Sequence, residues 1–103
     1  MHPPLTARSI HAVEIRLNDE RWLHITEEHA ELAGLRLEVL ETIERPERVL
    51  AGNGGELLSV RTIGPGKALV VVYREEDEDG FVITAFVTRR LAALARRRQT
   101  WPA

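Results

Sequence analysis

The sequence predicts an α+β fold, a small antiparallel β-sheet of about four strands with helices packed on one of its faces. Two patterns lead to this prediction. Apolar residues recur at helical spacing between residues 32 and 43. In the second half of the chain they follow the period of strands, and the connecting turns are so short that neighbouring strands must run antiparallel. Helices and strands in separate stretches of one chain are typical of the α+β class.

The N-terminal third is expected to contain a leader and two strands. Residues 1–8 are expected to form a loose leader. Alternating side chains over residues 10–17 predict a first strand, which ends at the turn-forming residues Asn18 and Asp19. Residues 21–25 are then expected to form a second, shorter strand, or the end of the first strand after a turn.

Two helical segments are expected next. Thr26 is a favourable N-cap residue, and the helix that it begins is expected to end or kink at Gly34. Residues 35–44 carry the clearest helical period, and Pro46 stops this helix. A single helical turn is expected to follow over residues 46–50.

The second half is expected to form three strands and a closing helix. The strands are expected at residues 57–63, 67–74 and 81–87, joined by a Gly-Pro-Gly turn and by an exposed acidic loop at 75–80. The middle strand is apolar on both faces, so it is expected at the centre of the sheet. A helix over residues 88–98, capped by Thr88, is expected to turn Leu91, Leu94 and Ala95 inward.

Length and composition narrow the class of protein. A chain of 103 residues predicts a single domain. No apolar run approaches the ~20 residues that span a bilayer, and the first residues lack the features of a signal peptide. We therefore expect a cytoplasmic protein without a membrane partner. The chain has no cysteine, which excludes disulfides and thiol catalysis. With four histidines as the remaining soft ligands, neither a metal site nor another cofactor is expected.

The charges are unevenly distributed. The formal net charge of −2 argues against a general nucleic-acid binder. Residues 75–79 form an acidic run, and five arginines follow between residues 89 and 98. The sequence alone favours two solvated surfaces. The alternative is a local basic surface that meets phosphate while the acidic loop points elsewhere.

Five short segments stand out along the chain. They are Trp22-x-His24-Ile25, His29-Ala30-Glu31, Glu41-Thr42-Ile43-Glu44-Arg45-Pro46-Glu47-Arg48-Val49, Lys67-x-Leu69-Val70-Val71-Val72 and Gly80-Phe81-Val82-Ile83-Thr84-Ala85. In this order they resemble small phage and bacterial members of the Barnase–EndoU–colicin–RelE nuclease superfamily. One position departs from that pattern, because Ala30 stands where the family has proline.

The resemblance implies a fold and an activity. It implies a four-stranded antiparallel sheet with helices on one side and an RNA-cleaving cleft on the other. Many members of this superfamily are toxins that pair with a protein antitoxin. RNA and an antitoxin protein are therefore the partners that the resemblance suggests.

Residues suited to metal-independent RNA cleavage are present. Attack by the ribose 2′-OH needs a base, an acid and cations that stabilise the phosphorane. His24 and His29 are candidates for the acid–base roles, because histidine titrates near neutral pH. The Thr84 hydroxyl is a candidate to bind phosphate or orient a histidine. Structural roles stay open for all three: a sheet-edge position, a backbone hydrogen bond in a helical turn, and packing within a strand.

Four further residues are candidates for RNA or phosphate binding. Arg61 and Lys67 flank the Gly-Pro-Gly turn, and Arg48 follows Pro46. Tyr73 shares a strand face with Lys67, where it could stack on a base or donate a proton. The resulting prediction is a toxin-like endoribonuclease. The alternative is a non-catalytic protein-interaction domain of the same fold, which the net negative charge favours, so whether the chain is an enzyme stays open at this point.

Overall fold

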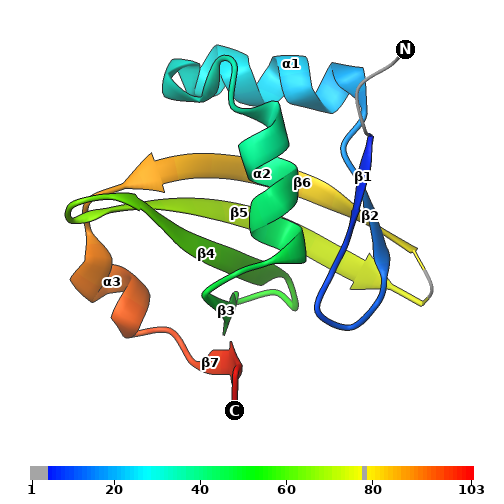
Figure 1. The fold of residues 1–103 in the computed structure, drawn as a ribbon. Helices are drawn as coiled ribbons and strands as arrows, with labels where there is room; N and C mark the ends of the chain where they lie inside the picture. The colour runs from blue at the N-terminus through cyan, green and yellow to red at the C-terminus, as the bar shows by residue number, and fades with distance from the viewer. Residues whose placement is uncertain (1–4, 78) are drawn as a thin grey trace.

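The computed structural model describes residues 5–77 and 79–103 and shows an α+β fold (Figure 1). A single mixed sheet has the strand order β1-β2-β6-β5-β4-β3-β7. The α+β class is confirmed. The sheet has seven strands, whereas the sequence predicted about four. The prediction fell short because the outer strands are only three or four residues long. Such short segments show no recognisable alternation in a sequence.

The three central strands are the ones that the sequence predicted. They are β4 (Leu57–Gly64), β5 (Lys67–Glu76) and β6 (Asp79–Thr88), paired antiparallel. Strand β5 lies near the middle of the sheet, as its apolar character indicated. Strands β5 and β6 extend into the acidic run that was expected to be a loop, because backbone pairing there continues to Glu76 and Asp79. Glu78 of that run lies outside the described residues.

Four short strands complete the sheet: β1 (Thr6–Arg8), β2 (Glu14–Arg16), β3 (Arg48–Ala51) and β7 (Gln99–Trp101). Strand β2 runs parallel to β6, so the sheet is mixed rather than antiparallel. Part of the expected leader forms β1, while residues 1–4 lie outside the described residues. Strand β3 replaces the helical turn expected over residues 46–50, because Leu50 and Val49 pair with β4 and fill the core.

The strand expected over residues 10–17 is interrupted by a turn. The Ser9 hydroxyl accepts hydrogen bonds from the backbone N–H groups of His11 and Val13, each at 3.3 Å. Ala12 has a positive φ of 62°. This local pattern reverses the chain before β2 begins, so only residues 14–16 remain extended in the sheet.

The first helix, α1 (Asp19–Glu28), replaces the strand expected over residues 21–25. Asn18 is its N-cap, and the Asn18 side chain accepts from the Arg21 N–H at 2.8 Å. Trp22 and Ile25 are three residues apart, so one helical face brings both to the core. Thr26 is therefore inside the helix, where its hydroxyl donates to the Leu23 carbonyl at 3.0 Å.

The remaining helices are a short 3-10 turn, η1 (Ala30–Leu32), then α2 (Arg36–Glu44) and α3 (Leu91–Ala95). The prediction of α2 is confirmed. Helix α3 is shorter than predicted, and of its three expected inward residues only Leu94 is buried. Thr88 accepts from the Arg90 N–H at 3.0 Å, so it caps the turn before α3 rather than the helix itself.

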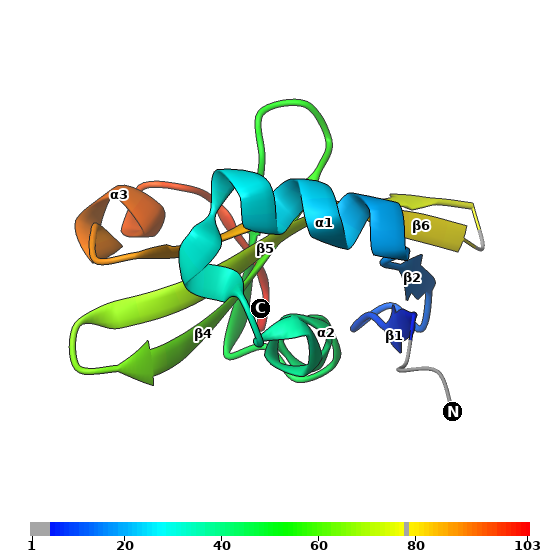
Figure 2. The ribbon, with the colours of Figure 1, turned by 90° about the horizontal axis from the view of Figure 1, so that it is seen from above.

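The sheet is covered on both faces. On the face that we call the front, α1 and α2 pack on a core that includes Leu69, Val71 and Tyr73. On the opposite face, the back, Leu94 of α3 packs with Val70 and its neighbours. Figure 2 shows α2 and α3 on opposite sides of the sheet and α1 along the edge near β6. The expectation that all helices lie on one face is therefore wrong.

Candidate nucleic-acid interface

A β-bulge in β6 determines which side chains reach the back face. Tyr73 of β5 pairs with Val82, but Val72 pairs with Thr84, so Ile83 is an extra residue in β6. Val82 accordingly packs in the front core, whereas Phe86 packs in the back core. The Thr84 side chain shares the back face with Val72, and not the face of Val82 as regular alternation implied. The bulge therefore places the Thr84 hydroxyl on the back of the sheet.

Helix α1 lies against this part of β6. The Arg21 guanidinium donates to the carbonyl oxygen of Ile83 at 3.5 Å, a long contact that ties the helix to the bulge. His24 and Arg21 line one hollow of about 330 Å³ with Asn18 and Glu20. His24 is therefore on the same flank of α1 as Arg21, three residues before it. The Arg21 contact with Ile83 is the link between this flank and the β6 segment that carries Thr84.

The His24 side chain is exposed and has one carboxylate neighbour, Glu28. Its Nε2 lies 3.3 Å from Oε1 of Glu28, one helical turn further along α1. The imidazole is 62 % exposed, so it is open to solvent and to a ligand. A carboxylate at this distance can orient the ring.

His29 is at the other end of the helix. Its N–H donates to the Ile25 carbonyl at 2.8 Å, which makes His29 the C-cap of α1. Its ring centroid is 6.2 Å from that of Phe86, and its Nδ1 is 3.7 Å from Glu31. Five residues advance a helix by about 7.5 Å and turn it by roughly 140°, so His24 and His29 point in different directions. The two histidines do not form a pair around one point.

A basic surface continues along the back face. Arg90 and Arg97 line a hollow of about 270 Å³ between α3 and the sheet, together with Phe86 and Thr88. Arg48 pairs with Val60, which packs in the back core, so Arg48 belongs to the same face. The arginines near α3 belong to the basic cluster seen in the sequence.

Arg74 adds to this surface. The Gly54 N–H donates to Glu56 at 2.7 Å and lowers the pKa of that carboxyl, and the charges of Arg74 and Arg97 lower it further. Both guanidinium groups therefore lie close enough to act on one carboxylate. Sequence reasoning missed Arg74 because an isolated arginine in a strand carries no functional signal. It missed Arg21 because residues 21–25 were expected to be a strand.

Arg61 and Lys67 are on the other side of the sheet. Arg61 pairs with Leu69, a front-core residue, and its guanidinium is 3.1 Å from Glu41 of α2. The neighbouring Thr62 donates through its N–H and its hydroxyl to Glu47, which lowers the pKa of that carboxyl. Lys67 follows the turn and is partly exposed. The structure does not bring these two cations together with His24.

Tyr73 is a core residue. Its side chain is fully buried between the sheet and the helices, and its hydroxyl has no hydrogen-bond partner among the described residues. The Ser59 hydroxyl lies near it without meeting it in hydrogen-bond geometry. Burial raises the pKa of Tyr73 to about 12, with a smaller opposing effect from Ser59. The predicted role in base stacking or proton donation does not fit this position.

We expect an alkaline loss of stability that depends on Tyr73. The folded pKa of about 12 is above the ordinary value of 10.0, so the fold favours the protonated phenol. This contribution is complete below pH 10 and is lost as the pH rises toward 12, by roughly 2–3 kcal/mol. Urea unfolding across this range should show the loss in the wild type and not in Tyr73→Phe. An equal loss in the variant would contradict this assignment.

Tyr73→Phe is a clean comparison in this chain. The sequence has one tyrosine and one lysine, so few other groups titrate in this range. Removing a buried hydroxyl that lacks a partner costs little, so the variant should be about as stable as the wild type at neutral pH.

Comparison with known proteins finds no matching family model, no similar curated protein and no similar solved structure. No helix in residues 5–77 and 79–103 is long and apolar enough to cross a bilayer. In the same part of the chain, no three histidine or carboxylate side chains gather in a way that would hold a metal ion.

Proposed function

We propose that this protein is a metal-independent endoribonuclease whose RNA lies across the back face of the sheet. One observation carries the proposal. An exposed histidine, His24, shares a hollow with Arg21, and Arg21 is held against the β-bulge that presents Thr84. The hollow supplies a titratable group and a cation, and the neighbouring β6 segment supplies a hydroxyl; these are the kinds of group that cleavage through the 2′-OH requires.

The roles of these groups follow from their chemistry. His24 takes the proton of the ribose 2′-OH while the 2′-oxygen forms a bond to phosphorus and the bond to the 5′-oxygen breaks. The products are a 2′,3′-cyclic phosphate and a 5′-hydroxyl, whose proton comes from water. Arg21 and Thr84 stabilise the negative charge of the phosphorane. Glu28 is a positioning residue, because it acts on His24 and not on the RNA.

His29 has a different role in this proposal. The sequence predicted it as a second acid–base group, but its ring lies beside Phe86 rather than on the flank of His24. Contact with RNA at the far end of α1 fits this position better than proton transfer at the same phosphate.

The charge distribution supports RNA on the back face. Residues 19–47, which contain α1 and α2, hold nine acidic and three basic residues. Residues 80–103 hold five arginines and no acidic residue. The negative charge is therefore concentrated in the helical segment and in the acidic run at residues 75–79, and the basic surface near α3 can still attract phosphate.

The proposal is tested with RNA and DNA oligonucleotides of the same sequence. We expect the purified protein to cleave the RNA in the presence of EDTA and to leave the DNA intact, because DNA lacks the 2′-OH. Loss of cleavage with EDTA would contradict the metal-independent mechanism. Cleavage of the DNA would contradict attack by the 2′-OH.

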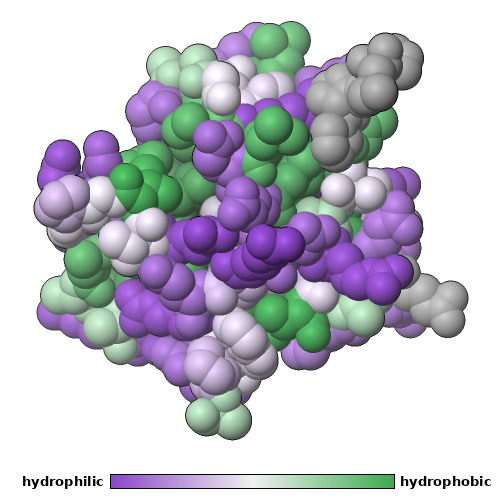
Figure 3. Space-filling view, in the orientation of Figure 1, coloured by the Kyte–Doolittle hydropathy of each residue, from purple (hydrophilic) through white to green (hydrophobic). Residues whose placement is uncertain are grey.

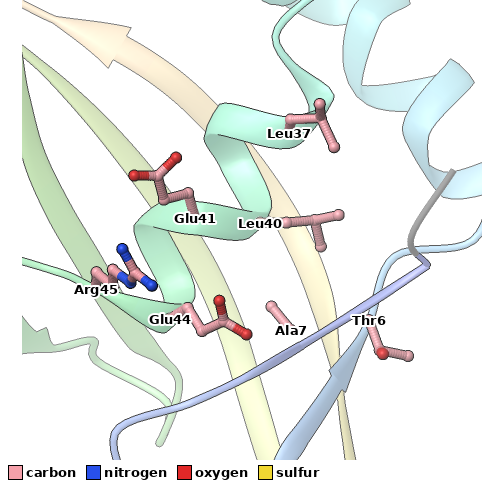
Figure 4. A pocket seen from close by; sticks show the side chains of 7 residues that line it. All are labelled: Thr6, Ala7, Leu37, Leu40, Glu41, Glu44 and Arg45. Atoms are coloured by element: carbon pink, nitrogen blue, oxygen red, sulfur yellow. The ribbon is translucent and has the colours of Figure 1, made fainter.

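A second candidate function, a protein-interaction domain, is favoured by one feature of the front face. A hollow of about 420 Å³ lies between β1 and α2, with Leu40 and Ala7 at its base (Figure 4). Leu37 at its end is 60 % exposed, and two carboxylates, Glu41 and Glu44, and one arginine, Arg45, lie along its rim. Figure 3 shows this mixture of hydrophobic surface and a hydrophilic band over the front of the molecule. A basic protein with an apolar side chain would fit, and by the family resemblance it would be an antitoxin.

The two candidate functions use opposite faces, so they can be separated. Leu37→Asp should abolish a protein complex, measured by co-purification with the partner, and should leave RNA cleavage unchanged. A complex that survives this substitution would contradict the assignment of the partner to this hollow.

A further inference from the structure

One row across the back face consists of an aromatic ring between two arginines. Phe81 of β6 pairs with Arg74 of β5 on one side and with Arg16 of β2 on the other. Paired residues of neighbouring strands project to the same face, with Cα atoms about 4.5–5.5 Å apart. The row lies on the back face because Gly80, the next residue along, pairs with Ile15 of the front core.

The ring and the two cations are accessible. Phe81 is 36 % exposed. Arg16 is 3.1 Å from Asp79, and both side chains are more than half exposed. Arg74 donates to the Gly54 carbonyl at 3.0 Å. Each guanidinium has five N–H donors, so these contacts leave donors free for a phosphate.

We infer that this row binds an unpaired nucleotide, with its base stacked on Phe81 and its flanking phosphates held by Arg16 and Arg74. The inference rests on the proposed function and adds the substrate class, single-stranded RNA. A base in a duplex is already stacked on its neighbours and cannot offer a face to Phe81, whereas an unpaired base can.

The charges around the row determine the path of the bound RNA across the sheet. One step further along the sheet, Glu14, Asp79 and Glu76 form an acidic row through the same pairings. Phosphate is repelled from that end. On the other side of Phe81 the strand leads to Thr84, three residues along β6 and about 10 Å away. The RNA therefore runs from Phe81 toward Thr84 and His24, and the stacked base is near the cleaved bond but is not part of it.

The test measures binding without cleavage. The probe is a short 2′-O-methyl oligoribonucleotide that cannot pair with itself, compared with the same strand annealed to its complement, and affinity is followed by fluorescence anisotropy. We expect the single strand to bind at least tenfold more tightly than the duplex. Phe81→Ala should weaken single-strand binding by about 5- to 150-fold, and Phe81→Trp should restore it.

Matched arginine variants test the phosphate contacts. Arg74→Gln should reduce the dependence of log K on log salt concentration by about 0.7, the effect of one lost contact to a single strand. Arg45→Gln, which changes the exposed C-cap residue of α2, should leave the salt dependence unchanged. Thermal unfolding of each variant checks that the fold is intact.

The results separate this inference from the proposed function. Equal binding by the wild type and Phe81→Ala, or equal binding of single strand and duplex, would overturn the stacking site even if the protein cleaves RNA. If binding depends on Phe81 but the matching all-ribose strand is not cleaved, the stacking site is supported. Only the proposed nuclease activity is then contradicted.

Discussion

His24→Ala is expected to lower the rate of EDTA-resistant RNA cleavage by about 10²- to 10⁴-fold, the usual contribution of one acid–base group. The substitution removes the one imidazole in the hollow, which Arg21 and Glu20 also line. Because His24 is largely exposed, its loss should leave the fold intact. The measurement is a single-turnover time course on one labelled RNA, with the melting temperature of each variant as a check.

Two comparisons make this result specific. His29→Ala should reduce the rate by less than about tenfold, since His29 lies beside Phe86 and away from the hollow. Leu23→Ala changes an equally exposed residue of α1 and should have no effect. An unchanged rate in His24→Ala, or a larger loss in His29→Ala, would show that the base has been assigned to the wrong residue.

Gly80→Ala is expected to destabilise the protein by about 2–4 kcal/mol. A Cβ at position 80 would overlap the carbonyl oxygen of Arg74 and lie 2.7 Å from Cδ1 of Ile15. The Arg74 carbonyl belongs to the backbone of β5 and cannot rotate away. The substitution would therefore separate β6 from β5 or from β2, and the midpoint of urea unfolding should fall clearly.

Gly54→Ala is the matched control for this substitution. Its added Cβ would meet side-chain atoms at 3.6 Å or more, which is ordinary van der Waals contact. The free energy of unfolding should change by less than about 0.5 kcal/mol. Similar losses in both variants would mean that glycine flexibility, and not the close approach of β5 and β2 to Gly80, explains the effect.

The sequence predicted the elements whose signals are local and long. The central strands and α2 each carry many repeats of one period, and these predictions are confirmed. The strand predicted over residues 21–25 is wrong because a window of five residues fits the helical and the strand period equally well. Asn18, the N-cap of α1, is also a residue typical of turns. Strands β1 and β7 are three residues long and exist through pairing with distant segments, which no local pattern reveals.

The candidate site was predictable only in part. His24 and Thr84 were singled out by residue type, and the fold brings α1 to the bulge of β6 that carries Thr84. Tyr73 was placed on the correct strand face, but that face is the buried one. The sequence gives no sign of Arg21 or of the row around Phe81, because these depend on a helix position and on a strand register.

The bulge at Ile83 has a consequence for how β6 tolerates change in length. Side chains of a regular strand alternate between the two faces of the sheet. Inserting or deleting one residue therefore moves every later side chain to the opposite face. Strand β6 already contains one extra residue at the bulge. The part before the bulge pairs with β2, and α1 contacts the strand at the bulge. Position 83 therefore separates two parts of β6 that can change in sequence independently, one paired with β2 and the other in contact with α1.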